Sequence, residues 1–140
     1  MLTREAPISV TIVEGPLGAP PSRPDDPGCG AWVVFEGVVR EDEGGRAVEA
    51  LDYTAYQPMA EDQLMLIARD AVRDHGLLYL MVEHSRGVVP VGGCSFRLSI
   101  GSGHRKEALA AMDEFIDRMK RDVPIWKRPV WRSERRPGRE

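Results

Sequence analysis

Two lysines, Lys120 and Lys127, stand on either side of a short Val-Pro-Ile-Trp connector, in a segment that also carries several arginines. Nearby positive charges disfavour protonation of a half-buried lysine, so they favour its neutral, nucleophilic form. Lysines, arginines and a tryptophan together also suit a flat, phosphorylated small molecule. The alternative is a solvated basic helix end, because cations at the C-terminus of a helix complement its dipole. Spacing alone leaves both interpretations open.

A second candidate site lies where a predicted strand passes into a helix, at His104 and Arg105. The first backbone amides of a helix are free and its dipole favours an anion there. An imidazole and a guanidinium beside them make a credible phosphate site. The alternative is a plain capped helix whose histidine and arginine face solvent. The sequence has neither a P-loop nor a nucleophile elbow, so phosphoryl transfer from nucleotides and serine hydrolase chemistry lack support.

The cysteines and histidines do not favour metal chemistry. Cys29 and Cys94 have no CxxC or Cys/His ligand spacing, and the histidines His75, His84 and His104 are scattered. The sequence therefore predicts no metal centre. His84 ends a predicted strand before a turn, and structural and functional interpretations of it are both open.

The composition predicts one domain, over residues 1–132, followed by a flexible basic tail over residues 133–140. Residues 118–140 carry nine Lys and Arg against three Asp and Glu, whereas the chain as a whole has a net charge of −3. An acidic body would repel a polyanion, which argues against nucleic acid. The sequence shows no secretory signal and no apolar run of about 18 residues, so we expect a cytoplasmic protein without a membrane span.

Hydrophobic patterning predicts an α+β fold with a mainly antiparallel sheet and helices packed on one face. A proline-rich surface loop is expected at residues 15–30. Helix-spaced apolar residues predict two buried helix faces. They are Ala60, Leu64, Ile67, Ala68 and Ala71 in the first helix, and Leu109, Met112, Ile116 and Met119 in the second. The expected strands cover residues 8–13, 31–40, 48–56, 77–83 and 94–100, with a last strand after the second helix.

Four collinear motifs resemble the large, catalytic subunit of molybdopterin synthase. The resemblance runs from about residue 8 to residue 128, and Pro-Ile-Trp-Lys after the helical lysine is its most specific part. The motifs are residues 30–40, residues 51–60, residues 103–105, and Lys120 together with residues 123–128.

The resemblance implies an α/β hammerhead-type fold and a homodimer. It also implies a small ubiquitin-like sulfur-carrier subunit that ends in Gly-Gly and brings sulfur as a terminal thiocarboxylate. Members of this family convert cyclic pyranopterin monophosphate into the molybdopterin dithiolene, a step of molybdenum cofactor biosynthesis. No metal or organic cofactor is implied for this sulfur transfer.

Carried over by position, the resemblance assigns catalysis to Lys120 and Lys127. It assigns substrate binding to Val38, Val39, Arg40, His104, Arg105 and Arg128. Pro129 stands where the family pattern leads us to expect an acidic residue, and the Arg-rich C-terminus is short. These departures leave an alternative open, a catalytically impaired relative that acts as a dimeric carrier-binding scaffold.

Overall fold

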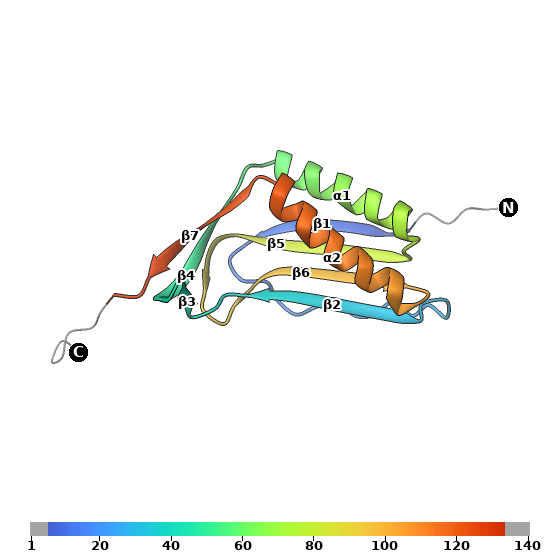
Figure 1. The fold of residues 1–140 in the computed structure, drawn as a ribbon, viewed down its shortest axis with the longest axis horizontal. Helices are drawn as coiled ribbons and strands as arrows, with labels where there is room; N and C mark the ends of the chain where they lie inside the picture. The colour runs from blue at the N-terminus through green and yellow to red at the C-terminus, as the bar shows by residue number, and fades with distance from the viewer. Residues whose placement is uncertain (1–5, 134–140) are drawn as a thin grey trace.

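The computed structural model describes residues 6–133 (Figure 1). Apart from Ser133, the predicted tail lies outside the described residues. The strands are β1 Ile8–Glu14, β2 Ala31–Val38, β3 Asp42–Glu43, β4 Arg46–Ala55, β5 Tyr79–Pro90, β6 Cys94–Ser102 and β7 Ile125–Trp131. The helices are α1 Met59–His75 and α2 Arg105–Asp122. The predicted α+β class is confirmed.

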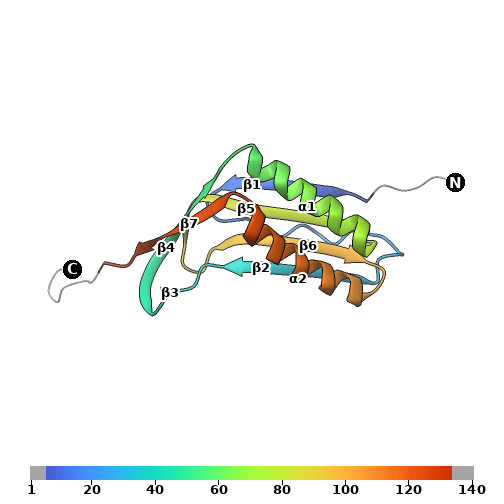
Figure 2. The same ribbon diagram turned by 45° about the horizontal axis from the view of Figure 1, so that its top comes forward.

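The strands pair in the order β2-β6-β5-β4-β3, with β1 parallel to β5 and β7 antiparallel to β4. The long strand β5 joins two parts of this sheet. Its first half pairs with β1 and β6, and its second half, from Gly87 onward, pairs with β4. Gly87 has a φ of 78°, a backbone conformation that residues with a Cβ rarely adopt, so the position favours glycine. Figures 1 and 2 show β3, β4 and β7 extending beyond the helices at one end of the molecule.

Both helices lie on the same face of the sheet, side by side (Figures 1 and 2). The apolar face predicted for α1 is confirmed, since all five residues are buried in the main core. The helix ends at Gly76, whose left-handed conformation (φ 65°) closes the last turn through a backbone bond to the carbonyl of Val72.

The buried face of α2 differs from the prediction at one position. Met112 and Met119 are buried as expected, but Leu109 is 52% exposed, so its assignment to the core was wrong. The helix packs over β2 and β6 at the edge of the sheet. Only a narrow stripe therefore has strands beneath it, and alanine, methionine and phenylalanine side chains fill that stripe. Its buried members are Ala108, Ala111, Met112, Phe115 and Met119.

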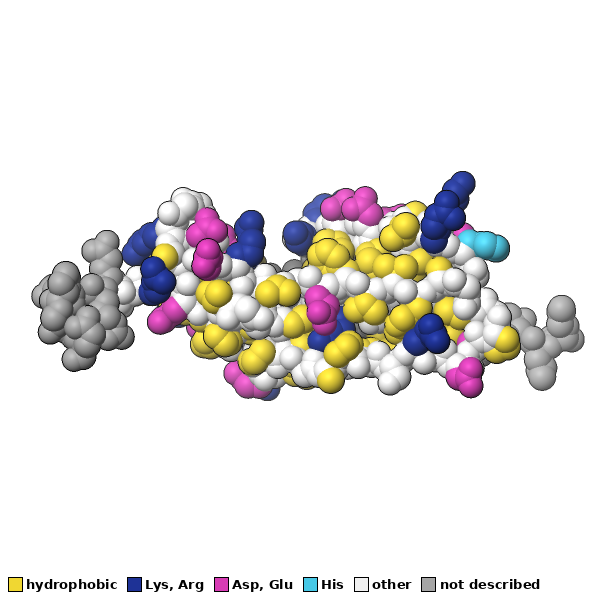
Figure 3. Space-filling view, turned by 90° about the horizontal axis from the view of Figure 1, so that it is seen from below, with side chains coloured by type: hydrophobic (Ala, Val, Ile, Leu, Met, Phe, Trp, Pro, Cys, Tyr) yellow, Lys and Arg dark blue, Asp and Glu magenta, His cyan; other side chains and the backbone are white. Residues whose placement is uncertain are grey.

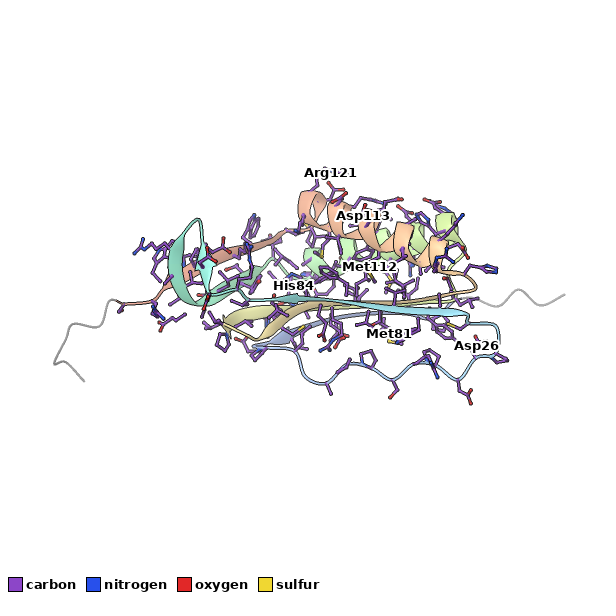
Figure 4. The ribbon with its side chains drawn as sticks, turned by 60° about the horizontal axis from the view of Figure 1, so that its bottom comes forward. Asp26, Met81, His84, Met112, Asp113 and Arg121 are labelled. Carbon is purple, nitrogen blue, oxygen red and sulfur yellow. The ribbon has the colours of Figure 1, made fainter. Side chains whose placement is uncertain are left out.

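The proline-rich loop of residues 15–30 covers the face of the sheet opposite the helices (Figure 4). Arg97 on β6 holds it there. This side chain is 2% exposed, and it binds the carboxylate of Glu36 at 2.7 Å and that of Glu83 at 3.1 Å. Its Nη2 also donates to the carbonyl of Gly18 at 2.7 Å. The buried guanidinium therefore ties β2, β5 and the loop together.

Within residues 6–133, neither helix has both the length and the apolar character needed to cross a membrane. The same residues contain no group of three or more His, Cys, Asp or Glu side chains placed to hold a metal ion.

Candidate functional site

A pocket of about 600 Å³ opens where the C-terminal end of α2 meets the bend of the sheet. Six strands and one helix contribute to it, so residues far apart in the sequence face one another. In Figure 3 this face of the molecule is notched between the part that carries β3, β4 and β7 and the part that carries the helices, and Lys and Arg side chains flank the notch. The lining residues used below are Phe35, Val38, Arg40, Glu43, Tyr53, His84, Ser95, Phe96, Lys120, Trp126 and Lys127.

Lys120 and Lys127 both line this pocket. Lys120 lies in the last turn of α2, and the chain then passes through Val123 and Pro124 into β7, which carries Lys127. The connector is short, so the helix end and the strand start stay together and both amines face one cavity. The structure gives Lys127 a carboxylate as its neighbour, since its Nζ lies 3.3 Å from Oε1 of Glu43. This acidic neighbour of Lys127 was not predicted from the sequence.

Arg128 lies outside the pocket. Adjacent residues of a strand point to opposite faces, so Arg128 leaves β7 on the side away from Lys127. Its Nη2 lies 3.3 Å from Oδ2 of Asp52, and its side chain is 79% exposed. The two cations that stand together in the sequence are thus separated in the fold.

The segment from Val38 to Arg40 divides in a similar way. A bulge between Gly37 and Val38 shifts the register of β2 against β6. Val38 and Arg40 line the pocket. Val39 points inward instead, is 3% exposed, and packs in a small core with Leu51. Val39 can therefore support the shape of the site but does not line it.

His104 and Arg105 lie at the far end of α2 from the lysines. Fifteen residues separate Arg105 from Lys120, which corresponds to roughly 22 Å along a helix. His104 is the N-cap residue, forms a capping box with Glu107, and has a side chain that is 87% exposed. Within one chain the structure therefore does not bring this pair to the pocket.

Several polar residues of the pocket were not among the residues assigned from the sequence. Tyr53 on β4 and Ser95 on β6 share a hydrogen bond of 2.8 Å between their hydroxyl groups. His84 on β5 lies beside them, 6% exposed, with its ring edge-on to Tyr53 at 5.3 Å. Burial lowers the pKa of His84 below its ordinary value of 6.5, although its hydrogen bond to the backbone of Ser85 acts in the opposite direction. At neutral pH this imidazole is uncharged.

These features define the class of the protein as an α+β domain with a half-open pocket that brings two lysines and an arginine together. Comparison with known proteins identifies its family. The MoaE protein family model matches residues 6–122. A molybdopterin synthase catalytic subunit of Aspergillus oryzae is 39% identical over 123 residues, which cover 86% of this chain and 69% of that protein. The human protein of the same name is 37% identical over 105 residues, which cover 75% of this chain and 56% of that protein.

Solved structures give the same result. The crystal structure of molybdopterin synthase from Staphylococcus aureus matches with a TM-score of 0.72 and 35% identity, covering 78% of this chain and 80% of that one. A complex of subunits 1 and 2 of molybdopterin-converting factor from Helicobacter pylori matches with a TM-score of 0.68 and 26% identity, covering 90% and 91%. The chain belongs to the MoaE family of molybdopterin synthase catalytic subunits. Its matches span from 33% to 69% of the length of the curated relatives compared, the lowest share being in Drosophila willistoni.

Proposed function

We propose that this chain transfers sulfur from a thiocarboxylated carrier subunit to cyclic pyranopterin monophosphate and so forms the molybdopterin dithiolene. The observation that carries the proposal is the convergence of Lys120, Lys127 and Arg40 on one pocket. Its family is one of enzymes, the sulfurtransferases named molybdopterin synthase catalytic subunits. A pocket with three cationic side chains suits a substrate that carries a phosphate and a sulfur donor that ends in an anion.

The lysines have a defined task in this chemistry. The thiocarboxylate sulfur bonds to a carbon of the pterin side chain and displaces an oxygen substituent, which leaves with the electron pair of the broken carbon–oxygen bond. The carrier is then attached through a thioester. Water then attacks the acyl carbon and the carbon–sulfur bond to the carrier breaks. The carrier leaves as a carboxylate, and the sulfur stays on the pterin. The tetrahedral intermediate carries an oxyanion, and the ammonium groups of Lys120 and Lys127 can stabilise it or move protons.

The carrier reaches this site from the open side of the pocket. The rim there is apolar: the side chain of Val38 is 51% exposed and that of Trp126 is 59% exposed. A flexible tail that ends in Gly-Gly is narrow enough to enter a cavity of about 600 Å³ alongside a substrate. The related structure from Helicobacter pylori is a complex of two subunits, which supports a small-subunit partner.

A second copy of the chain can supply the residues that one copy lacks. Among the described strands, β2 pairs only with β6, so its other edge is open. Figure 3 shows hydrophobic side chains gathered along this edge and the adjoining helix; those that are substantially exposed include Val34, Phe35 and Leu109. A twofold axis beside the middle of α2 would set the two helices antiparallel. His104 and Arg105 of one copy would then approach the lysines of the other.

The alternative is a dimeric scaffold that binds the carrier without turnover. One experiment distinguishes the enzyme from the scaffold. The purified chain is supplied with thiocarboxylated carrier and cyclic pyranopterin monophosphate, and the incorporation of two sulfur atoms is measured by mass spectrometry. We expect Lys120→Ala to reduce the rate at least 100-fold, on the order of a lost acid–base or oxyanion group. Lys106→Ala, in the exposed first turn of the same helix, serves as the matched control. If the wild-type chain binds the carrier but forms no product, the scaffold function is the one supported.

Two further expectations belong to this proposal. The free thiols of Cys29 and Cys94 suit a reducing, cytoplasmic compartment. The main core takes residues from both helices and from every described strand except β3, and this continuity supports a single domain in the predicted range of residues 1–132.

A further inference from the structure

His84 stands where a buried row of β5 leaves the core and enters the pocket. Leu80 and Val82 belong to the same row, and both are fully buried beneath the helices. The next residue of the row on this face is a histidine that is 6% exposed and lines the pocket. Figure 4 shows His84 on the helix side of the sheet. An apolar side chain would satisfy the core here, so the imidazole needs another explanation.

The hydrogen bonding of His84 fixes which nitrogen is free. Its Nδ1 lies 2.8 Å from the carbonyl oxygen of Ser85. A carbonyl oxygen only accepts, so Nδ1 carries the proton and Nε2 of the neutral ring keeps its lone pair. Within residues 6–133 no hydrogen bond to Nε2 is found, and Nε2 is not among the fully enclosed unpaired atoms, which are Glu61 Oε1 and Ser99 Oγ. The acceptor atom is therefore open to the pocket.

The surroundings of His84 hold the ring in this orientation. The ring of Tyr53 on β4 lies edge-on to it, with 5.3 Å between ring centroids, and the ring centroid of Phe96 on β6 lies 5.8 Å away. Side chains from both neighbouring strands therefore restrict the rotation of the imidazole. The other strong acceptors of the pocket already have partners, since Glu43 binds Lys127 and Glu36 binds Arg97. A ligand held by the cationic side chains thus meets an unpaired acceptor at the buried end of the cavity.

We propose that His84 is a specificity-determining residue, whose Nε2 accepts a hydrogen bond from a ring N–H or amino group of the heterocyclic substrate. The inference rests on the proposed function, because it takes a nitrogen heterocycle as the ligand. Its anionic end would lie against the lysines and Arg40, and its donor edge would face His84. A buried acceptor without a partner discriminates strongly against ligands that lack the matching donor.

Two substitutions separate this role from a structural one. In His84→Asn the amide lies near the position of Nδ1 and can keep the bond to Ser85, but nothing replaces Nε2. In His84→Gln the longer side chain brings its amide close to the position of Nε2. We expect His84→Asn to raise KM for the pterin about tenfold, the loss of one net hydrogen bond, with kcat changed less than twofold. We expect His84→Gln to recover most of the affinity, and the control His75→Asn to leave KM unchanged. Equal KM values for all the variants would overturn the proposal.

A measurement on the unmodified chain covers the case in which these variants do not fold. With ¹⁵N-labelled histidine, the chain gives signals from three residues. Those of His84 are assigned by elimination with His75→Asn and His104→Asn. Cyclic pyranopterin monophosphate is added without carrier, so that no turnover occurs. We expect the Nε2 signal of His84 to shift when the chain is saturated with pterin. If pterin binds and this signal does not shift, the role proposed for His84 is refuted while the proposed function stands. Absence of pterin binding to the wild-type chain would overturn the proposed function and this inference with it.

Discussion

Lys127 on β7 and Glu43 on β3 form an ion pair across the pocket, with Nζ 3.3 Å from Oε1. The two residues are 84 positions apart in the sequence. They meet because β4 pairs with β3 on one side and with β7 on the other. Gly44 and Gly45, both with positive φ, allow the tight turn that brings Glu43 back over β4. Within one chain, a lysine proposed to act on an anionic substrate thus already has an anionic partner, which the substrate must displace.

Replacing Glu43 by Gln should strengthen substrate binding. The substitution removes a negative charge from the pocket and releases Lys127, whose side chain is 53% exposed. Exposed ion pairs of this kind contribute about 0.2–1 kcal/mol, so we expect KM for the pterin to fall roughly 1.5- to 5-fold. The effect should shrink as salt is added, because charges near solvent are screened. Glu41→Gln is the matched control, since Glu41 is exposed and does not line the pocket. A higher KM in Glu43→Gln would show that the carboxylate positions Lys127 productively.

Replacing Arg97 by Met should destabilise the fold, although Arg97 itself does not line the pocket. The guanidinium is 2% exposed, and its loss leaves the carboxylates of Glu36 and Glu83 and the carbonyl of Gly18 without their donor. Removing one partner of a buried ion pair costs about 3 kcal/mol or more. Urea unfolding should show that loss, whereas Arg121→Met, which breaks an exposed pair with Asp122, should change the free energy of unfolding by less than about 0.5 kcal/mol. A loss below about 1 kcal/mol in the Arg97 variant would mean that the loop is held in other ways.

The lowered pKa of His84 should appear in the pH dependence of stability. Burial favours the neutral ring in the folded chain, whereas the unfolded chain protonates near the ordinary value of 6.5. Below pH 6.5 the unfolded state binds more protons than the folded state. The free energy of unfolding therefore decreases as the pH is lowered from 6.5 to the folded pKa of His84, and above pH 6.5 this contribution is constant. Unfolding measured between pH 7.5 and 5 should therefore show a steeper loss in the wild type than in His84→Gln. The comparison isolates His84 from the charged pocket residues Arg40, Lys120, Lys127, Glu36 and Glu43. Parallel curves would contradict the assignment of a buried neutral imidazole.

The fold was predictable where a local pattern determines burial. The five apolar residues of α1 recur at helical spacing, and all are buried, because one face of that helix covers the sheet. Leu109 follows the same rule and is exposed, since α2 lies at the edge of the sheet. The parallel pairing of β1 with β5 joins residues about 70 positions apart, and nothing in either strand alone indicates it.

The pocket was only partly predictable for a similar reason. Lys120 and Lys127 are linked by a short connector, so their proximity follows from the sequence. The opposite directions of Lys127 and Arg128 also follow, from strand alternation, once residues 125–131 are recognised as a strand. Glu43 meets Lys127 because β4 pairs with β7, and His84 meets Tyr53 because β5 pairs with β4; both pairings join strands with at least one helix between them in the sequence. For His84 the one available signal was its place two residues after Val82 in an otherwise apolar row.

A mixed dimer tests whether two copies of the chain complete each other's pockets. If Arg105 of one copy serves the lysines of the other, a heterodimer of Lys120→Ala and Arg105→Ala has one pocket with both defects and one with neither. We expect each parental homodimer to have less than about a tenth of wild-type activity, and the purified heterodimer to recover about half, because one of two pockets is intact. The control pairs Lys120→Ala with Lys127→Ala. Both lysines line the same pocket, so each site of that heterodimer keeps one defect and should stay inactive. A Lys120/Arg105 heterodimer no more active than its parents would mean that His104 and Arg105 do not act across the dimer, and the separation of roughly 22 Å within one chain would then exclude them from the pocket altogether.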